Sequence, residues 1–288
     1  MKVARSPSEL ETMPRAVALG TFDGVHLGHQ KVIEETRDSG LRSTIVTFDP
    51  HPRVVFGNQV ELISSLERRL ELLEELGVDD TLVVEFTLDL ARREPAEFAD
   101  EFLRPIGTEL VVAGTDFRFG RGRQASIETL GELGFETRTI ELLGHISSTR
   151  IRDLVRQGRV EEAAPLLGRP VEVDGVVVSG DARGGTLGFP TANLRVASNL
   201  LVPAFGIYAG AAGDHRAAVS IGMNPHYGGR ERRVEAHLLD FDGDLYGERL
   251  VIQLWQRLRD EQAFASEADL IAQIAQDVET ARNARPPI

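Results

Sequence analysis

The sequence contains no cysteine among its 288 residues. Disulfide bonds, thiolate metal sites and a cysteine nucleophile are therefore excluded. No hydrophobic run approaches the roughly 20 apolar residues of a membrane-spanning helix, and residues 1–6 lack the apolar core of a secretory signal. We therefore expect a cytoplasmic protein with no membrane partner.

Positive charge is also scarce, because 32 Lys and Arg residues are outnumbered by 45 Asp and Glu residues, which gives a net charge of −13. Proteins that bind long nucleic acids are more often basic, so we expect no nucleic-acid partner. A nucleotide needs only a few local cations and backbone N–H groups, so it stays a candidate ligand. The chain is 42% hydrophobic, which is enough for two cores, and its length suggests two domains.

The first half of the chain alternates between short apolar strands and amphipathic helices. Such alternation is typical of a parallel, doubly wound α/β sheet, whose ligands bind at the carboxyl ends of the strands. We expect strands near residues 16–19, 43–48, 81–86, 109–113 and 136–142, and helices near 26–37, 65–76, 95–103 and 147–157.

The pattern changes near residue 168, after which strand-like segments follow one another without intervening helices. This is typical of a small antiparallel β-barrel or sandwich. Gly168-Arg169-Pro170 would break a helix, so we expect the connection between the two domains at 159–170. We expect strands near 171–179, 206–212, 216–221, 233–241 and 248–258, followed by a C-terminal helix over 266–284.

The stretch 20–30 follows the first buried strand and reads Gly-Thr-Phe-Asp-Gly-Val-His-Leu-Gly-His-Gln. Glycines let a backbone approach a ligand closely, and a helix N-terminus favours phosphate. His26 and His29 are three residues apart, so on a helical turn they share one face and could donate to phosphate oxygens. The stretch therefore predicts a phosphate-binding turn. The alternative is a packed strand–turn–helix in which both histidines are incidental.

Two later segments carry groups that suit a nucleotide substrate. Asp116 and Phe117 follow the strand at 109–113, where a ligand ring or ribose could meet them; the alternative is an aromatic turn packed on the core. The segment 146–152, Ile-Ser-Ser-Thr-Arg-Ile-Arg, opens a helix. Its hydroxyls, N–H groups and arginines suit a triphosphate; the alternative is an ordinary N-cap with surface arginines.

Together, residues 15–158 resemble the adenylyltransferase half of bacterial FAD synthetases, which belong to the nucleotidylyltransferase superfamily. The most specific parts are Gly-x-Phe-Asp-Gly-x-His-x-Gly-His and Ile-Ser-Ser-Thr-x-Ile-Arg. The resemblance implies transfer of AMP from ATP to the phosphate of FMN, which gives FAD and pyrophosphate. Because that phosphate is already a nucleophile, catalysis would rest on positioning and on stabilisation of charge.

The same resemblance implies roles for single residues. His26 and His29 would hold the phosphates and the transition state, and Asp116 and Phe117 would lie near the flavin. Residues 121–126 depart from the family, which often has a Gly-Asp pair there. The other ATP contacts would come from Gly20, Phe22, Asp23, Gly24 and Gly28, and from Ser148, Thr149 and Arg152 at the β- and γ-phosphates.

A second glycine-rich loop spans residues 180–193 and could wrap phosphates with its N–H groups. It is not a Walker A loop, because no Gly-Lys-Ser/Thr follows. Thr191 and Asn193 are two residues apart, so an extended segment would present both on one side, and their oxygens suit Mg²⁺. The alternative is a glycine-rich hairpin with a polar end.

Glu235 is a carboxylate among apolar neighbours in a predicted strand, and it shares a strand face with His237. A carboxylate in this setting could take a proton from a substrate hydroxyl. The alternative is a residue at the rim of the barrel, with no part in catalysis.

Residues 168–285 resemble bacterial riboflavin kinases, on Gly-x-x-Leu-Gly-Phe-Pro-Thr-Ala-Asn, Pro-Ala-Phe-Gly-Ile-Tyr at 203–208, Ile-Gly-Met-Asn-Pro at 221–225, and Asp-Leu-Tyr-Gly at 244–247. The resemblance implies a small barrel with a C-terminal helix. The implied reaction is attack of the riboflavin 5′-hydroxyl on the γ-phosphate of ATP, with Glu235 as the base. ATP would be bound by Gly180, Gly188, Thr191 and Asn193, the last two with Mg²⁺.

Two residues depart from the kinase pattern. His226 stands where the family usually has Thr after Asn-Pro, and Gly185 stands where an Arg is common. The first departure could alter a flap near the substrates, and the second would remove a phosphate contact.

We therefore predict a doubly wound α/β nucleotidylyltransferase domain at 1–163 and a small antiparallel β-barrel kinase domain with a C-terminal helix at 164–288. The predicted enzyme makes FMN and then FAD, with ATP, riboflavin and FMN as its small-molecule substrates, and could form a homo-oligomer. One alternative is a single-function nucleotidylyltransferase with an accessory flavin-binding barrel. Another is a regulator that binds flavin or nucleotide without catalysis.

Overall fold

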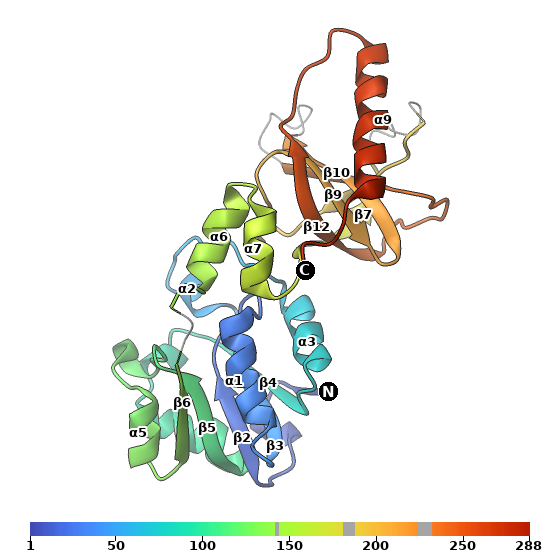
Figure 1. Cartoon of the computed structure of the whole chain (residues 1–288). Helices are drawn as coiled ribbons and strands as arrows, with labels where there is room; N and C mark the ends of the chain where they lie inside the picture. The colour runs from blue at the N-terminus through green and yellow to red at the C-terminus, as the bar shows by residue number, and fades with distance from the viewer. Residues whose placement is uncertain (142–143, 181–187, 224–231) are drawn as a thin grey trace. The chain divides into compact units, whose positions relative to one another are not determined.

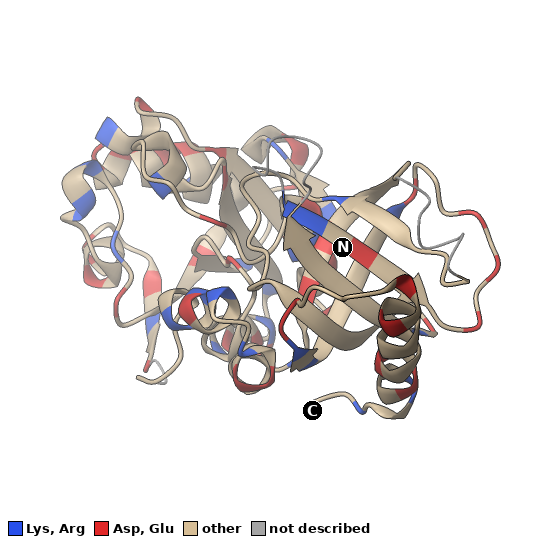
Figure 2. Ribbon diagram, turned by 90° about the horizontal axis from the view of Figure 1, so that it is seen from above, with Lys and Arg blue, Asp and Glu red and all other residues tan. Residues whose placement is uncertain are grey.

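The computed structural model describes residues 1–141, 144–180, 188–223 and 232–288 (Figure 1). The chain divides into two compact units, residues 1–60 with 66–147 and residues 61–65 with 148–288. The first unit holds a six-stranded parallel sheet with helices, and the second holds a closed antiparallel barrel with a C-terminal helix. The predicted fold class is therefore confirmed. Acidic and basic residues are interspersed along the ribbons of both units (Figure 2).

In the first unit the strands lie in the order β1-β4-β3-β2-β5-β6. The chain passes from β2 through β3 to β4 on one side, and then returns to β5 on the other side of β2. The carboxyl ends of β2 and β5 therefore flank the topological switch point, where sheets of this kind bind ligands. The strands are β1 (Lys2–Ala4), β2 (Arg15–Leu19), β3 (Arg42–Asp49), β4 (Asp80–Glu85), β5 (Thr108–Gly114) and β6 (Glu136–Ile140).

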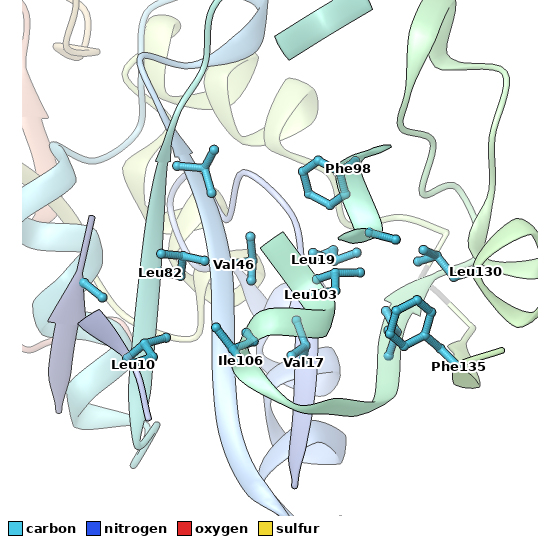
Figure 3. Packing of buried hydrophobic residues seen from close by; sticks show 14 residues of the cluster. Leu10, Val17, Leu19, Val46, Leu82, Phe98, Leu103, Ile106, Leu130 and Phe135 are labelled. Carbon is cyan, nitrogen blue, oxygen red and sulfur yellow. The ribbon is translucent and has the colours of Figure 1, made fainter. Parts of the chain in front are cut away.

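Side chains alternate between the two faces of the sheet, and the central strand β2 is buried on both of them. Val17 and Leu19 pack into the cluster of Figure 3, which includes Phe98 and Leu103, whereas Ala16 and Ala18 face a second cluster. The helices of the unit are α1 (Leu27–Arg37), α2 (Pro52–Val55), α3 (Leu66–Glu75), α4 (Pro95–Phe98) and α5 (Ile127–Glu132).

The helix expected over 95–103 differs in type from the prediction. It is α-helical only in α4, and it continues as a π-helical turn at Ala99–Leu103. Pro105 follows closely and lacks the N–H that a longer α-helix would use. The change of helix type keeps Phe98 and Leu103 buried in the same cluster.

The second unit is built on a barrel of six strands in the order β10-β11-β8-β7-β12-β9, all pairs antiparallel. Helix α9 (Glu267–Asn283) is held on the barrel by Arg259, whose guanidinium donates to Asp277 at 2.6 Å. The strands are β7 (Val171–Val178), β8 (Ala192–Arg195), β9 (Gly206–Ala212), β10 (His215–Met223), β11 (Arg232–Leu238) and β12 (Arg249–Arg259).

Two helices, α6 (Ser148–Arg156) and α7 (Val160–Leu167), also belong to the barrel unit. Residues 159–170 were expected as a connection, but they form α7 as far as Leu167. Gly168, with φ of 72°, then ends the helix in the left-handed conformation that favours glycine. The predicted helix break therefore lies at Gly168, and the residues before it are helical.

Gly210 provides a test of the barrel packing. A Cβ at this position would lie 1.9 Å from the backbone oxygen of Gln253 on the neighbouring strand. We expect Gly210→Ala to lower the free energy of unfolding by about 3 kcal/mol, because the backbones must move apart. Gly144→Ala is the control, since a Cβ there has nothing within 4 Å. Equal unfolding midpoints in urea for the two variants would contradict this packing.

Candidate active sites

The turn after β2 carries the predicted phosphate-binding stretch, and the sequence of the turn explains its shape. His26 is the N-cap of α1, and its Nδ1 accepts a hydrogen bond from the backbone N–H of His29 at 3.3 Å. A neutral imidazole that accepts at Nδ1 carries its proton on Nε2, which is then a donor. The predicted phosphate ligand would thus meet an N–H group of His26 at the start of a helix.

The two histidine rings are stacked, with their centroids 3.6 Å apart and an angle of 15° between the planes. His26 is buried, whereas His29 is partly exposed and meets the edge of Phe22 at 5.3 Å. Imidazole N–H groups donate hydrogen bonds, so a stacked pair of them at the start of a helix suits an anion whose charge grows during a reaction.

Close packing in this turn needs glycine at position 28. A Cβ on Gly28 would lie 3.2 Å from the ring of His26, so a larger residue would push on the imidazole. Phe22 and Val25 have positive φ angles of 49° and 39°, which are rare for such side chains. The Gln30 amide donates to the Val25 carbonyl at 2.9 Å and helps to hold this strained backbone.

Arg69 is a residue that the sequence did not single out. It lies on α3 and is 1% exposed. Its Nη1 donates to the Thr21 carbonyl at 2.6 Å, to the Thr47 hydroxyl at 3.1 Å and to the Phe48 carbonyl at 3.3 Å. Arg69 therefore ties the turn after β2 to the end of β3. Its position three residues after Leu66 places Arg69 on the buried side of the helix, and the sequence alone could have indicated this.

The charge of Arg69 is part of the site. Burial lowers the pKa of Arg69, and the negative charges of Asp23 and Asp49 act in the opposite direction. Asp23 is itself buried at 1% exposure in the turn after β2. A buried cation thus lies beneath the turn that is predicted to bind phosphates.

The loop after β5 combines packing with exposure. Phe117 stacks on Phe119 with centroids 5.5 Å apart, and Phe119 meets Phe98 at 5.8 Å. Phe117 is partly buried against the core, whereas Asp116 is exposed. The loop therefore has an aromatic base supported by the core and a carboxylate beside it, so core packing and ligand binding are both compatible with it.

The predicted triphosphate residues Ser148, Thr149 and Arg152 lie in the first turns of α6, in the barrel unit. Arg152 is 6% exposed, and its Nε donates to the Glu61 carbonyl at 2.8 Å within that unit. His26, by contrast, belongs to the first unit.

In the barrel, two predicted kinase residues are direct neighbours. Asn193 on β8 and Glu235 on β11 pair in register, so their side chains lie side by side on one face. Arg233, two residues before Glu235, donates from Nε to the Asn193 amide oxygen at 3.3 Å and from Nη2 to the Glu235 carboxylate. The sequence did not single out Arg233. Its position two residues before Glu235 in a predicted strand nevertheless indicates that the two side chains share one face.

Residues around this pair also fit together closely. A Cβ on Gly180 would lie 2.3 Å from the Asn193 side chain, so glycine leaves room for the amide. His237 hydrogen-bonds through Nδ1 to the Pro190 carbonyl at 2.8 Å, which holds the end of the glycine-rich loop against β11. Thr191 lies immediately before β8 and is partly exposed, and Gly188 has a φ of 88°.

Some of the predicted features lie outside the described residues. Gly185 falls within 181–187, and His226 falls within 224–231. Among the residues that are described, no group of three or more His, Asp or Glu side chains could hold a metal ion. In that same part of the chain, no helix is long and apolar enough to cross a membrane.

Two family models match the chain, one over the parallel sheet and one over the barrel. The FAD synthetase family model matches residues 8–152, and the riboflavin kinase family model matches residues 167–285.

Curated relatives match almost the whole length of this chain. Bifunctional riboflavin kinase/FMN adenylyltransferases of Listeria monocytogenes and Bacillus subtilis are 38% and 35% identical, covering 93% and 94% of this chain and 91% and 92% of theirs. The Escherichia coli K12 protein of the same name is 35% identical over 98% of this chain and 97% of its own. A Streptococcus pneumoniae crystal structure, named a macrolide-efflux protein, is 31% identical with a TM-score of 0.86, covering 98% of this chain and 99% of that one.

The doubly wound sheet and the closed barrel, each with its own predicted phosphate turn, define a two-module transferase. Two family models and relatives of matching length identify it further. The chain belongs to the bifunctional riboflavin kinase/FMN adenylyltransferase family. The prediction of an enzyme with both modules is confirmed over the single-function alternative.

Arg69 yields a prediction for the adenylyltransferase module. We expect Arg69→Met to slow FAD formation from FMN by about 10- to 100-fold, because small displacements of positioning groups have effects of this size. Arg69→Lys keeps the positive charge but not the planar guanidinium. Its rate of FAD formation should therefore lie between those of the wild type and Arg69→Met. Product analysis by chromatography checks both variants.

Riboflavin phosphorylation by the same chains is the control for folding. An Arg69→Met protein that makes FAD at the wild-type rate would contradict the positioning role. Equal losses in both reactions would indicate general destabilisation and would also contradict it.

Proposed function

We propose that the barrel module phosphorylates riboflavin with ATP and that the α/β module adenylylates the resulting FMN. The observation that carries the proposal is the register of β8 and β11, which pairs the Asn193 amide with the Glu235 carboxylate. A hydroxyl nucleophile needs a base, and this barrel pairs a carboxylate with a group suited to phosphate or metal. The proposed catalytic modules are residues 1–163 and 164–288.

In the kinase reaction, Glu235 accepts the proton of the riboflavin 5′-hydroxyl as its oxygen attacks the γ-phosphorus. The β–γ bridging bond breaks and ADP leaves. Gly180 and Gly188 are proposed to contact the ATP phosphates. Glu235 is partly exposed, with 23% of its side chain accessible, so a substrate can reach it.

Thr191 and Asn193 are the proposed magnesium ligands. Their neutral oxygens suit Mg²⁺, which usually keeps several waters and phosphate oxygens as further ligands. Asn193 is partly exposed and pairs in register with Glu235, so its amide oxygen lies beside a carboxylate whose negative charge favours a cation. When bound, Mg²⁺ would neutralise part of the negative charge of the ATP phosphates.

In the adenylyl transfer, the FMN phosphate attacks the α-phosphorus of ATP and pyrophosphate leaves. His26 and His29 donate to the phosphates, and the backbone of the turn after β2 lies against them. This backbone belongs to Gly20, Phe22, Asp23, Gly24 and Gly28. The proposal assigns Ser148, Thr149 and Arg152 to the leaving β- and γ-phosphates.

Asp116 and Phe117 are the proposed flavin contacts of this module. Phe117 offers a partly exposed ring whose position is supported by Phe119 and Phe98. An isoalloxazine ring stacks well on such an aromatic base. Location in the cytoplasm and assembly into a homo-oligomer remain predictions.

Glu235→Gln tests the kinase assignment. It keeps the shape of the side chain but removes the base, so FMN formation should fall by about 10²- to 10⁴-fold, the usual contribution of a general base. Conversion of added FMN to FAD should stay within about 2-fold, because it needs no protein base. Equal loss of both reactions would refute separate sites, and unchanged FMN formation would refute Glu235 as the base.

His29→Ala tests the other module. We expect FAD formation from FMN to fall by about 10²-fold or more, because a donor to the developing charge is lost. Riboflavin phosphorylation should continue, so FMN should accumulate in the reaction mixture. FAD formation at the wild-type rate would show that His29 has no part in the transfer.

A further inference from the structure

Arg233 lies between the two side chains on which the proposed kinase reaction depends. Its Nε donates to the Asn193 amide oxygen at 3.3 Å, and its Nη2 donates to the Glu235 carboxylate. About a quarter of each charged side chain is exposed, 25% for Arg233 and 23% for Glu235. The guanidinium is therefore held at the site and still has access to an incoming substrate.

The geometry of phosphoryl transfer places the γ-phosphate close to this guanidinium. The riboflavin hydroxyl must lie within hydrogen-bond reach of Glu235, about 3 Å, and its oxygen must approach the γ-phosphorus to about 3–3.5 Å. The transferred group is thus within about 6.5 Å of the Glu235 carboxylate by these two distances. The Arg233 guanidinium, which contacts that carboxylate, lies in the same small region.

Charge gives Arg233 a reason to change partners when ATP binds. A carboxylate that accepts from a guanidinium is a weaker base than one without such a partner. The triphosphate carries more negative charge than a single carboxylate, and guanidinium groups bind phosphate oxygens in a favourable paired geometry. Bound ATP would therefore draw Arg233 toward its phosphate oxygens and leave Glu235 better able to accept a proton.

We infer that Arg233 is a catalytic residue of the kinase module that binds the γ-phosphoryl group of ATP during transfer; the inference rests on the proposed role of Glu235. The oxygen of the riboflavin hydroxyl forms a bond to the γ-phosphorus, its proton goes to Glu235, and the bridging oxygen leaves with ADP. Arg233 gains and loses no proton. Its positive charge stabilises the negative charge on the equatorial phosphoryl oxygens.

The first test compares two neighbouring arginines. Arg233→Gln should lower kcat for FMN formation by about 10²-fold, the usual effect of losing one donor to a transition-state charge. Arg233→Lys should recover at least about 10-fold of that loss, because it keeps a cation. Arg232→Gln is the matched control, since Arg232 donates instead to the Val202 carbonyl at 2.8 Å. Its rate should stay within about 2-fold, as for a surface change that leaves the Asn193 and Glu235 contacts in place.

Adenylylation of added FMN by the same proteins reports whether the chain is folded. An Arg233→Gln rate equal to that of Arg232→Gln overturns the inference, whether both are near wild type or both have fallen. A wild-type protein that makes no FMN overturns the proposed kinase function, and the inference fails with it. A wild-type protein that makes FMN while Arg233→Gln does so equally well overturns the inference alone.

A second test separates phosphate binding from orientation of Glu235. On the Glu235→Gln background, Arg233→Gln should reduce the residual rate by a further factor of about 10 or more, because the phosphate contact does not require the carboxylate. No further loss would mean that Arg233 acts only through Glu235, which contradicts direct contact with the phosphoryl group.

A third test uses inhibitors that differ by one phosphate. Arg233→Gln should weaken inhibition of FMN formation by a non-hydrolysable ATP analogue about 10-fold and change inhibition by ADP by less than about 2-fold, since only the analogue has a γ-phosphate to accept the charged hydrogen bonds. Equal changes for the two inhibitors would contradict a contact at the γ-phosphate.

Discussion

Because all strands of the first sheet are parallel, their carboxyl ends meet at one edge. The switch point between β2 and β5 then fixes where a ligand can be held. The turn after β2 meets this constraint with a helix N-terminus, two stacked histidines and a strained backbone. Buried Arg69 ties that turn to the end of β3, so the cation is as much a part of the site as the two imidazoles.

The barrel follows a different constraint, the alternation of side chains along antiparallel strands. Asn193 and Glu235 lie side by side because β8 and β11 pair in that register, and a slip of one residue would send Glu235 to the other face. The two modules also differ in their nucleophiles. A phosphate attacks without help, whereas a hydroxyl needs a base, and a carboxylate lies in the strand where that base is proposed.

Much of the fold, and part of each candidate site, was predictable from local sequence patterns. The alternating strands and helices, the barrel strands and the terminal helix follow from periodicity, and the glycine and histidine turn follows from residue types within a few positions. Arg233 and Arg69 were missed, because their meaning depends on partners in other elements. Asn193, for example, is 40 residues from Arg233 in sequence but hydrogen-bonds to it. The helical character of α7 was also missed, because residues 159–170 were expected as a connection, whereas the helix continues to Leu167 and ends at Gly168.

The two modules together make one chain that carries out two successive ATP-dependent transfers. A timed product analysis of the wild-type protein given riboflavin, ATP and Mg²⁺ tests this directly. FMN should appear first and FAD should follow, with ADP formed in the first step and pyrophosphate in the second. A mixture in which neither FMN nor FAD forms would contradict it.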